Sequence, residues 1–224
     1  MVKQINDEAP VLQGPEVLLL ISSHCAHCAA VLKVVTAMVK QGDMTALKIM
    51  NLEKVPELAQ QLGVRSVPWL KIGEFVFEGE LTAAEIQHWM NEVSSEQGEK
   101  VYLYEMLIDG NVDKVIDYIK QTPHALQTVA KFMLDADAKI NLKLGVGVIF
   151  EEFASDALVD TVIPQLLAYI DSDDARVRGD ACHYLSLIGR DEFVPVFEEC
   201  LLDDNVDVRE IAQESLDELL LKRK

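Results

Sequence analysis

The chain has 224 residues, of which 20 are Lys or Arg and 38 are Asp or Glu, so its formal net charge is −18 at pH 7. An acidic surface of this kind repels phosphate backbones and anionic lipid headgroups, and we expect neither a nucleic acid nor a membrane as partner. Half of the residues are hydrophobic, which is enough for one large or two small cores, and no run of eighteen apolar residues occurs.

Cysteine usage and the first residues indicate a compartment. Residues 1–8 are polar and acidic and lack a secretory pattern. Four cysteines in a chain of this length do not form a disulfide framework, which fits a reducing compartment where cysteines are catalytic or unpaired. We therefore expect a cytoplasmic protein.

The first predicted elements meet at a pair of cysteines. The apolar run 16–22 predicts a buried strand, and apolar residues at helical spacing predict a helix over residues 29–39. Between them lies Cys25-Ala26-His27-Cys28, and two thiols at this spacing can form and exchange a disulfide. The motif therefore predicts redox chemistry at a helix start.

Three residues of this motif have expected roles. Unpaired amides and the positive end of the helix dipole favour a thiolate, so we expect a lowered pKa for Cys25 and assign it as the nucleophile. Cys28, one turn further in, is the expected resolving thiol. A protonated His27 stabilises the Cys25 thiolate, which favours the dithiol form and makes the disulfide a better oxidant.

Two other interpretations fit the same cysteines. The pair could supply half of a zinc site, with His24 or His27 as a further ligand. A structural zinc takes four N or S ligands, however, and Cys182 and Cys200 are distant single residues. The pair could also be inert, because free cysteine often serves as a small buried hydrophobe. We expect no metal and no other cofactor.

Residues 47–93 predict two helices and three strands, and a capping residue marks the start of the last helix. Thr82 is the expected cap of a helix, with Glu85 three residues on. The predicted elements are a strand over 47–50, a helix over 55–62, a strand opened by Val67-Pro68, an alternating edge strand over 74–79 and an amphipathic helix over 81–93.

Residues 10–94 resemble thioredoxin. The resemblance rests on the joint occurrence of the C-x-x-C, the Val67-Pro68 pair and Gly79 at compatible spacing. It implies an α/β thioredoxin-like fold over residues 1–95, a cis peptide bond before Pro68, and a loop whose backbone pairs with the substrate. The expected substrate-binding residues are Val67, Pro68, Trp69 and His24. Trp69 would form an apolar wall for a peptide, the alternative being a packing role beside strand-forming residues. His24 would add positive charge next to Cys25, the alternative being a solvated loop residue.

The chain departs from the thioredoxin pattern at three places. His24 stands where the family has tryptophan, and Leu19 stands where it has a buried aspartate, so deprotonation of Cys28 needs another route. Val31 and Leu32 occupy the region of the kink-forming proline. The Cys-x-His-Cys type is similar to protein disulfide isomerases and periplasmic oxidants, whereas a reducing compartment favours a reductase or isomerase-like role over net oxidation.

Beyond the polar segment 94–99 the pattern is all helical, and it repeats. Residues 163–167 return 31 positions later as 194–198, each followed by an acidic turn, a Val-Arg pair and a small residue. This period indicates stacked helical hairpins, each too small to bury its apolar face alone. The turn and the Val-Arg pair resemble a HEAT repeat, which implies an all-α HEAT-like solenoid over residues 96–224.

Within these repeats, four residues are assigned to structure. Arg178 and Arg209 are expected to bond to the acidic turns and the neighbouring repeat, and Cys182 and Cys200 to be small core residues. Residues 101–119 predict a further helical pair. A weaker third copy is matched by Leu126, Val129, Ala130 and Met133 in its first helix and by Ile140, Leu144 and Val148 in its second, although Gly145 and Gly147 disfavour the latter.

These patterns predict a thiol–disulfide oxidoreductase that reduces or exchanges disulfides through Cys25 and Cys28. The acidic repeats would recognise a protein client that carries a disulfide or a reactive thiol. The alternative is a non-enzymatic scaffold or assembly factor, in which both domains bind proteins and the cysteines are structural or sense the redox state. A metal-handling protein that uses His24, Cys25, His27 and Cys28 is the third interpretation.

Overall fold

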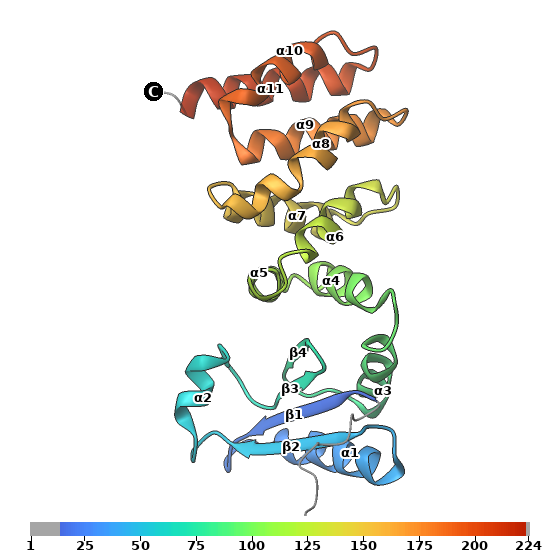
Figure 1. Ribbon diagram of the computed structural model, residues 1–224, viewed down its shortest axis with the longest axis vertical. Coiled ribbons are helices and arrows are strands. Elements are labelled where there is room, and N and C mark those ends of the chain that lie inside the picture. The colour runs from blue at the N-terminus through green and yellow to red at the C-terminus, as the bar shows by residue number, and fades with distance from the viewer. Residues whose placement is uncertain (1–13, 223–224) are drawn as a thin grey trace, which may run out of the picture. The chain divides into compact units, whose positions relative to one another are not determined.

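The computed structural model describes residues 14–222, which form two compact units, one ending at Glu99 and one beginning at Lys100 (Figure 1). The polar segment 1–8, for which no secretory pattern was expected, lies outside the described residues. The domain border predicted between residues 95 and 96 stays a prediction.

The first unit is a four-stranded mixed sheet with helices, in the strand order β2-β1-β3-β4. The central strand β1 pairs in parallel with β2 and antiparallel with β3, and β4 pairs antiparallel with β3. The predicted order of elements and the thioredoxin-like fold are confirmed. The elements are β1 (Glu16–Ile21), α1 (Cys28–Gln41), β2 (Ala46–Asn51), α2 (Pro56–Gln61), β3 (Trp69–Ile72), β4 (Phe75–Glu78) and α3 (Ala83–Glu92).

Aromatic side chains join α3 to one face of this sheet. The register places Leu19 beside Leu70 and Leu70 beside Phe77, so the three side chains share a face. Trp89 of α3 packs on that face, with its ring centroid 5.0 Å from that of Phe77. The predicted start of α3 is confirmed, because Thr82 and Glu85 form a complete capping box.

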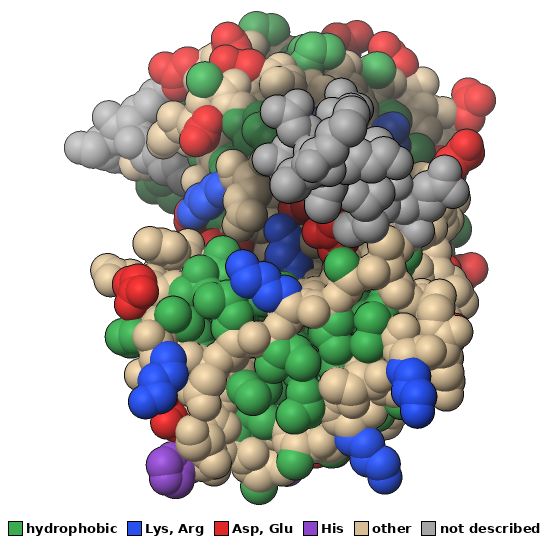
Figure 2. Space-filling view, turned by 60° about the horizontal axis from the view of Figure 1, so that its bottom comes forward, with side chains coloured by type: hydrophobic (Ala, Val, Ile, Leu, Met, Phe, Trp, Pro, Cys, Tyr) green, Lys and Arg blue, Asp and Glu red, His purple; other side chains and the backbone are tan. Residues whose placement is uncertain are grey.

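The edge strand β2 has side chains that are exposed to solvent. Ile49 is 39% exposed, and its neighbour Lys48 is exposed as well. Figure 2 views the protein from the side at which Figure 1 draws α1 and β2, and shows apolar side chains gathered among lysine or arginine side chains. A lysine on an edge strand discourages pairing with a strand of another molecule.

The second unit is built of successive helices, and the predicted all-α HEAT-like repeats are confirmed. The second helices of the predicted pairs form one layer, because α5 contacts α7, α7 contacts α9, and α9 contacts α11. The helices are α4 (Gly98–Ile108), α5 (Val112–Gln121), α6 (Ala125–Ala130) with the 3-10 turn η1 (Lys131–Leu134), α7 (Ile140–Phe153), α8 (Ile163–Ile170), α9 (Ala175–Ile188), α10 (Val194–Cys200) and α11 (Val206–Lys222).

Arginines tie neighbouring turns of this unit together, as the sequence predicts. The Arg178 guanidinium donates from Nε and Nη2 to the Asp203 carboxylate at 2.7 and 2.8 Å, and from Nη1 to the Ser172 carbonyl at 2.8 Å. Arg209 donates to the Asp203 carbonyl of its own turn at 2.7 Å. The bonds from Arg178 hold the pKa of the Asp203 carboxyl well below its usual range.

The predicted inward face of α7 is wrong, although the inward face of the preceding helix is confirmed. Ile140, Leu144 and Val148 are 67%, 62% and 46% exposed. Residues on the opposite side of the helix fill the core instead, namely Leu142, Val146, Ile149, Phe150 and Phe153. Because apolar residues lie on more than one side of α7, their spacing alone does not determine which side faces inward.

The two glycines of α7 explain its orientation. A Cβ atom at Gly145 would lie 2.9 Å from Cδ2 of Leu107, and one at Gly147 would lie 3.2 Å from Cδ1 of Leu187. The glycines therefore permit close approach of neighbouring elements on two sides of α7. Glycine destabilises a helix by about 1 kcal/mol relative to alanine. At these two positions, however, a larger side chain would come too close to Leu107 or Leu187.

The lowered pKa of Asp203 makes the second unit sensitive to acid. The bonds from Arg178 stabilise the folded state fully above the ordinary Asp pKa of 3.8, and this contribution is lost as the pH falls from there toward the lowered folded pKa. Asp203→Asn is expected to reduce stability at pH 7 and to flatten its loss between about pH 5 and pH 2. Urea midpoints measured across this range test it.

Asp160→Asn is the matched control, because Asp160 bonds to Arg190 through a side chain that is 57% exposed. Exposed ion pairs contribute little to stability, so this variant should keep the wild-type pH profile. An unaltered acid profile in Asp203→Asn would contradict the assignment.

Candidate functional site

The cysteine motif lies in the turn that leads from β1 into α1. Cys25 and Cys28 are joined as a disulfide, with their Cα atoms 5.4 Å apart. The helix begins at Cys28, so the expectation that Cys25 itself stands at the helix start is wrong by three residues. The turn nevertheless brings the sulfur of Cys25 to the helix terminus.

The Cys25 sulfur receives a hydrogen bond from the helix start. The backbone N–H of Cys28 donates to Sγ of Cys25 at 3.0 Å. This amide is one of the first in α1, which have no acceptor within the helix, and it carries the positive end of the helix dipole. After reduction the same bond stabilises a Cys25 thiolate.

Exposure distinguishes the two sulfurs. Cys25 is partly exposed, whereas Cys28 is only 4% exposed and belongs to the core. An incoming disulfide therefore reaches Cys25 first, and Cys28 lies behind it. This order fits the predicted roles of nucleophile and resolving thiol.

The loop before β3 lies against Cys25. The Val67 carbonyl oxygen is 3.5 Å from Sγ of Cys25, and the Val67–Pro68 peptide bond is cis, as the resemblance implies. The Pro68 carbonyl accepts the N–H of Gly79 at 2.9 Å, which holds the loop to the end of β4. Residues 42 positions apart in sequence are thus brought together at the disulfide.

The burial of Trp69 corrects one prediction about this loop. Val67 is partly exposed and Pro68 is buried, while Trp69 is 2% exposed at the start of β3. A side chain buried to this extent packs in the core and offers no apolar wall to a substrate. Trp69 is buried because it is the first residue of β3 and packs with the strand, and no ligand is needed to explain its place.

A carboxylate accompanies each histidine of the motif, and sequence reasoning missed both. His27 Nδ1 lies 2.5 Å from Oε2 of Glu80, which follows β4. His24 is 93% exposed and lies 3.4 Å from Oε1 of Glu53. The two glutamates are 53 and 29 residues away from their histidines in sequence, so no local sequence pattern predicts these pairs.

Glu53 also holds the turn in front of the cysteines. Its carboxylate accepts the N–H and the hydroxyl of Ser23 at 2.9 and 2.8 Å, and Asn51 donates to the same hydroxyl oxygen at 3.0 Å. These bonds from Ser23 lower the pKa of Glu53. The turn that presents Cys25 is therefore tied to the end of β2.

The core beneath the cysteines contains leucine where thioredoxin has an acid. Leu19 of β1 is fully buried. Among residues 14–222, the buried polar side chains are Ser186 and Ser215, and both belong to the second unit. The described part of the first unit therefore holds no buried acid beneath Cys28.

The remaining cysteines contact each other, although the sequence treats them as distant singles. Cys182 and Cys200 are 0% and 4% exposed, and their thiols share a hydrogen bond. That bond and burial raise the pKa of the Cys182 thiol far above its usual range. The same bond lowers the pKa of the Cys200 thiol, so it is the burial of both side chains that fits the predicted core role.

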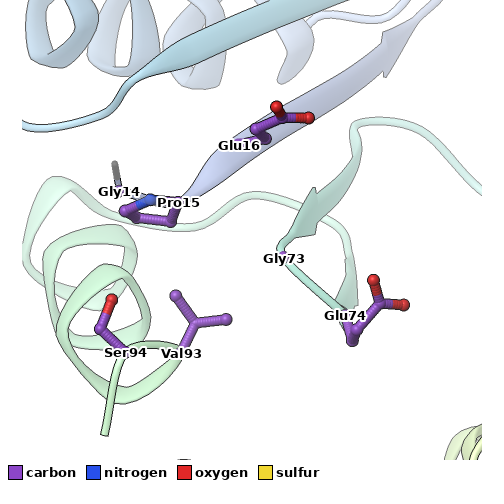
Figure 3. A pocket seen from close by; sticks show the side chains of 7 residues that line it. All are labelled: Gly14, Pro15, Glu16, Gly73, Glu74, Val93 and Ser94. Atoms are coloured by element: carbon purple, nitrogen blue, oxygen red, sulfur yellow. The ribbon is translucent and has the colours of Figure 1, made fainter. Parts of the chain in front are cut away.

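A hollow elsewhere in the first unit does not belong to this site. It lies at the start of β1 and the end of α3, whereas the cysteines follow the end of β1 (Figure 3). Its lining offers carboxylates but neither thiol nor imidazole: Gly14, Pro15, Glu16, Gly73, Glu74, Val93 and Ser94. We assign it no chemistry.

Across residues 14–222, no group of three or more His, Cys, Asp or Glu side chains is arranged to hold a metal ion. In the same range, no helix has the length and apolar character needed to cross a membrane.

Comparison with known families agrees with both units. A family model of the thioredoxin domain matches residues 16–91, which include both cysteines of the motif and the Val67–Pro68 loop. A family model of HEAT repeats matches residues 134–217, which include α7 to the greater part of α11. No curated protein matches the chain.

The four thiols are expected to react with iodoacetamide at very different rates in the reduced native protein. Cys25 should react fastest, about tenfold or more ahead of the others, because it is partly exposed and its thiolate accepts the N–H of Cys28. Cys182 and Cys200 should react only after unfolding in urea. Mass spectrometry of peptides from a time course measures each site, and native labelling of Cys182 as fast as Cys25 would refute the assignment.

Proposed function

We propose that this chain, which joins a thioredoxin domain to HEAT repeats, is a thiol–disulfide oxidoreductase that acts through Cys25 and Cys28. The acidic repeats supply recognition of a protein client that carries a disulfide or a reactive thiol. The proposal places the reaction in the cytoplasm, because the four cysteines do not build a disulfide framework.

The observation that carries the proposal is the setting of the Cys25 sulfur. It lies between the N–H of Cys28 at 3.0 Å and the carbonyl of Val67 at 3.5 Å. The first contact favours a thiolate, and the second marks a backbone segment that can bind an extended substrate beside the reacting sulfur. A pair of inert core cysteines requires neither contact.

Reduction of a client proceeds in two exchange steps. The Cys25 thiolate attacks one sulfur of the client disulfide, a bond forms between them, and the other client sulfur leaves as a thiolate. The Cys28 thiolate then attacks the Cys25 sulfur and releases the second client thiolate. The client gains two electrons and two protons, and the Cys25–Cys28 pair loses them as its disulfide forms.

The direction of exchange depends on the charges around Cys25. A protonated His27 stabilises the thiolate and makes the disulfide more oxidising, while the Glu80 carboxylate holds the His27 ring and offsets its charge. Because the charge of His27 is offset, exchange or reduction is favoured over strong net oxidation. Leu19 supplies no proton acceptor for Cys28, so release of the reduced client proceeds without a dedicated buried base.

A non-enzymatic scaffold is the second candidate, and the same residue Leu19 favours it. A core without a carboxylate gives Cys28 no dedicated base, as expected if the fold serves only to bind proteins. Partner binding that is unaffected by Cys25→Ser and Cys28→Ser, together with no exchange activity, would support the scaffold and overturn the oxidoreductase.

The resolving role of Cys28 is tested by trapping. With a synthetic peptide that contains one disulfide, Cys28→Ser should accumulate a mixed disulfide at Cys25, because the second exchange step is missing. Cys25→Ser should form none and should lose turnover by about a hundredfold or more. Cys182→Ala, a core variant outside the motif, serves as the control and should keep wild-type exchange per folded molecule.

The role of His27 is tested by the reduction potential of the pair. Removal of the imidazole in His27→Ala should make the disulfide less oxidising, with a potential lower by about 30 mV, or tenfold in the exchange equilibrium. Thiol trapping across a glutathione series measures it. His24→Ala, at the 93% exposed position, is the control, and an equal shift in both variants would remove the special role of His27.

A further inference from the structure

Three large apolar side chains stand in a row on the outer side of α7. Ile140, Leu144 and Val148 are 67%, 62% and 46% exposed, and their spacing of four residues places them on one helix face. We call these three residues the α7 stripe. Leu134, which ends the preceding turn η1, is 48% exposed as well.

The fold does not need the α7 stripe. The core side of α7 is complete without it, since Leu142, Val146 and Phe150 on the other side are fully buried. Single exposed apolar residues are ordinary, but a row with helical spacing is the pattern by which a helix or groove receives a partner.

Carboxylates lie on α7 and on the helix α5 that contacts it. Asp117 of α5 and Glu151 of α7 are exposed, and Glu152 of α7 is engaged by Lys120 of α5 at 2.9 Å. Lys139, next to Ile140, is exposed as well. Closer to the stripe, the Lys143 ammonium is already engaged by Asp180 of α9 at 2.9 Å. The helical part of the chain, residues 99–224, has 13 Lys and Arg against 26 Asp and Glu.

This charge distribution decides between two occupants. A second copy of the chain would bring two acidic surfaces of net charge −18 together, which opposes association. A partner with apolar side chains on one face and Lys or Arg beside them satisfies both the stripe and its surroundings.

We propose that the α7 stripe docks a basic amphipathic helix of the client protein. Its large apolar side chains cover Ile140, Leu144 and Val148, and its lysines or arginines face the surrounding carboxylates. The inference rests on the proposed function only in assigning client recognition to the repeats. It names the surface that performs this recognition and the chemistry of the segment that binds there.

The test uses the full chain and a fluorescent 18-residue peptide of Leu and Lys in amphipathic order as the probe. Anisotropy titrations should show saturable binding that weakens with salt, and Leu144→Ser should reduce the affinity about tenfold or more. Leu202→Ser is the matched control, because Leu202 is 86% exposed in the turn after α10 and lies outside the stripe. A peptide with Glu in place of Lys should not bind.

Two results would overturn the docking proposal. One is equal affinity of the Leu144→Ser and wild-type proteins for the Leu/Lys peptide, with circular dichroism showing both folded. The other is concentration-dependent dimerisation in sedimentation that Leu144→Ser abolishes, because a second copy then covers the stripe.

Exchange activity separates this proposal from the proposed function. The Leu144→Ser variant should reduce the small disulfide peptide at the wild-type rate, since that peptide does not need the repeats. Stripe-dependent binding in a protein without exchange activity would leave the docking site standing and overturn the oxidoreductase alone.

Discussion

The central place of β1 is the constraint on which the first unit depends. β1 has strand neighbours on both edges, and the adjacent residues Leu19 and Leu20, which point to opposite faces of the sheet, are both fully buried. The register pairs Leu20 with Trp69, so β3 begins beside the end of β1. For that reason the Val67–Pro68 loop and the cysteine turn, which lie just beyond these two positions, meet at the same end of the two strands.

The same burial shapes the chemistry of the cysteine pair. The side chain of Leu19 in β1 packs in the core and offers Cys28 no proton acceptor, so the polar groups around the cysteines lie on the exposed side of the site. There Glu53 and Glu80 hold the two histidines and the turn. Exposed groups of this kind are screened by water, so their charges act on the two sulfurs more weakly than a buried acid would.

The second unit depends on contacts between successive repeats. Arg178 joins its own turn to the Asp203 carboxylate of the next, with side chains only 14% and 12% exposed. Gly145 and Gly147 let α7 approach its neighbours closely. The bonds of Arg178 and the two glycines thus determine how the helices stack. In this arrangement the α7 stripe stays exposed to solvent.

The sequence by itself determined what depends on nearby residues: the order of elements, the capping box of Thr82, the redox motif and the 31-residue repeat. Only the tertiary structure decided which side of α7 is buried, because its apolar residues lie on more than one side and its glycines show their role only where they meet Leu107 and Leu187. It also decided that Glu80 lies at His27, that Cys182 meets Cys200 and that Trp69 is buried. Such pairings arise from closure of the sheet and stacking of the repeats over tens of residues, and local periodicity carries no information about them.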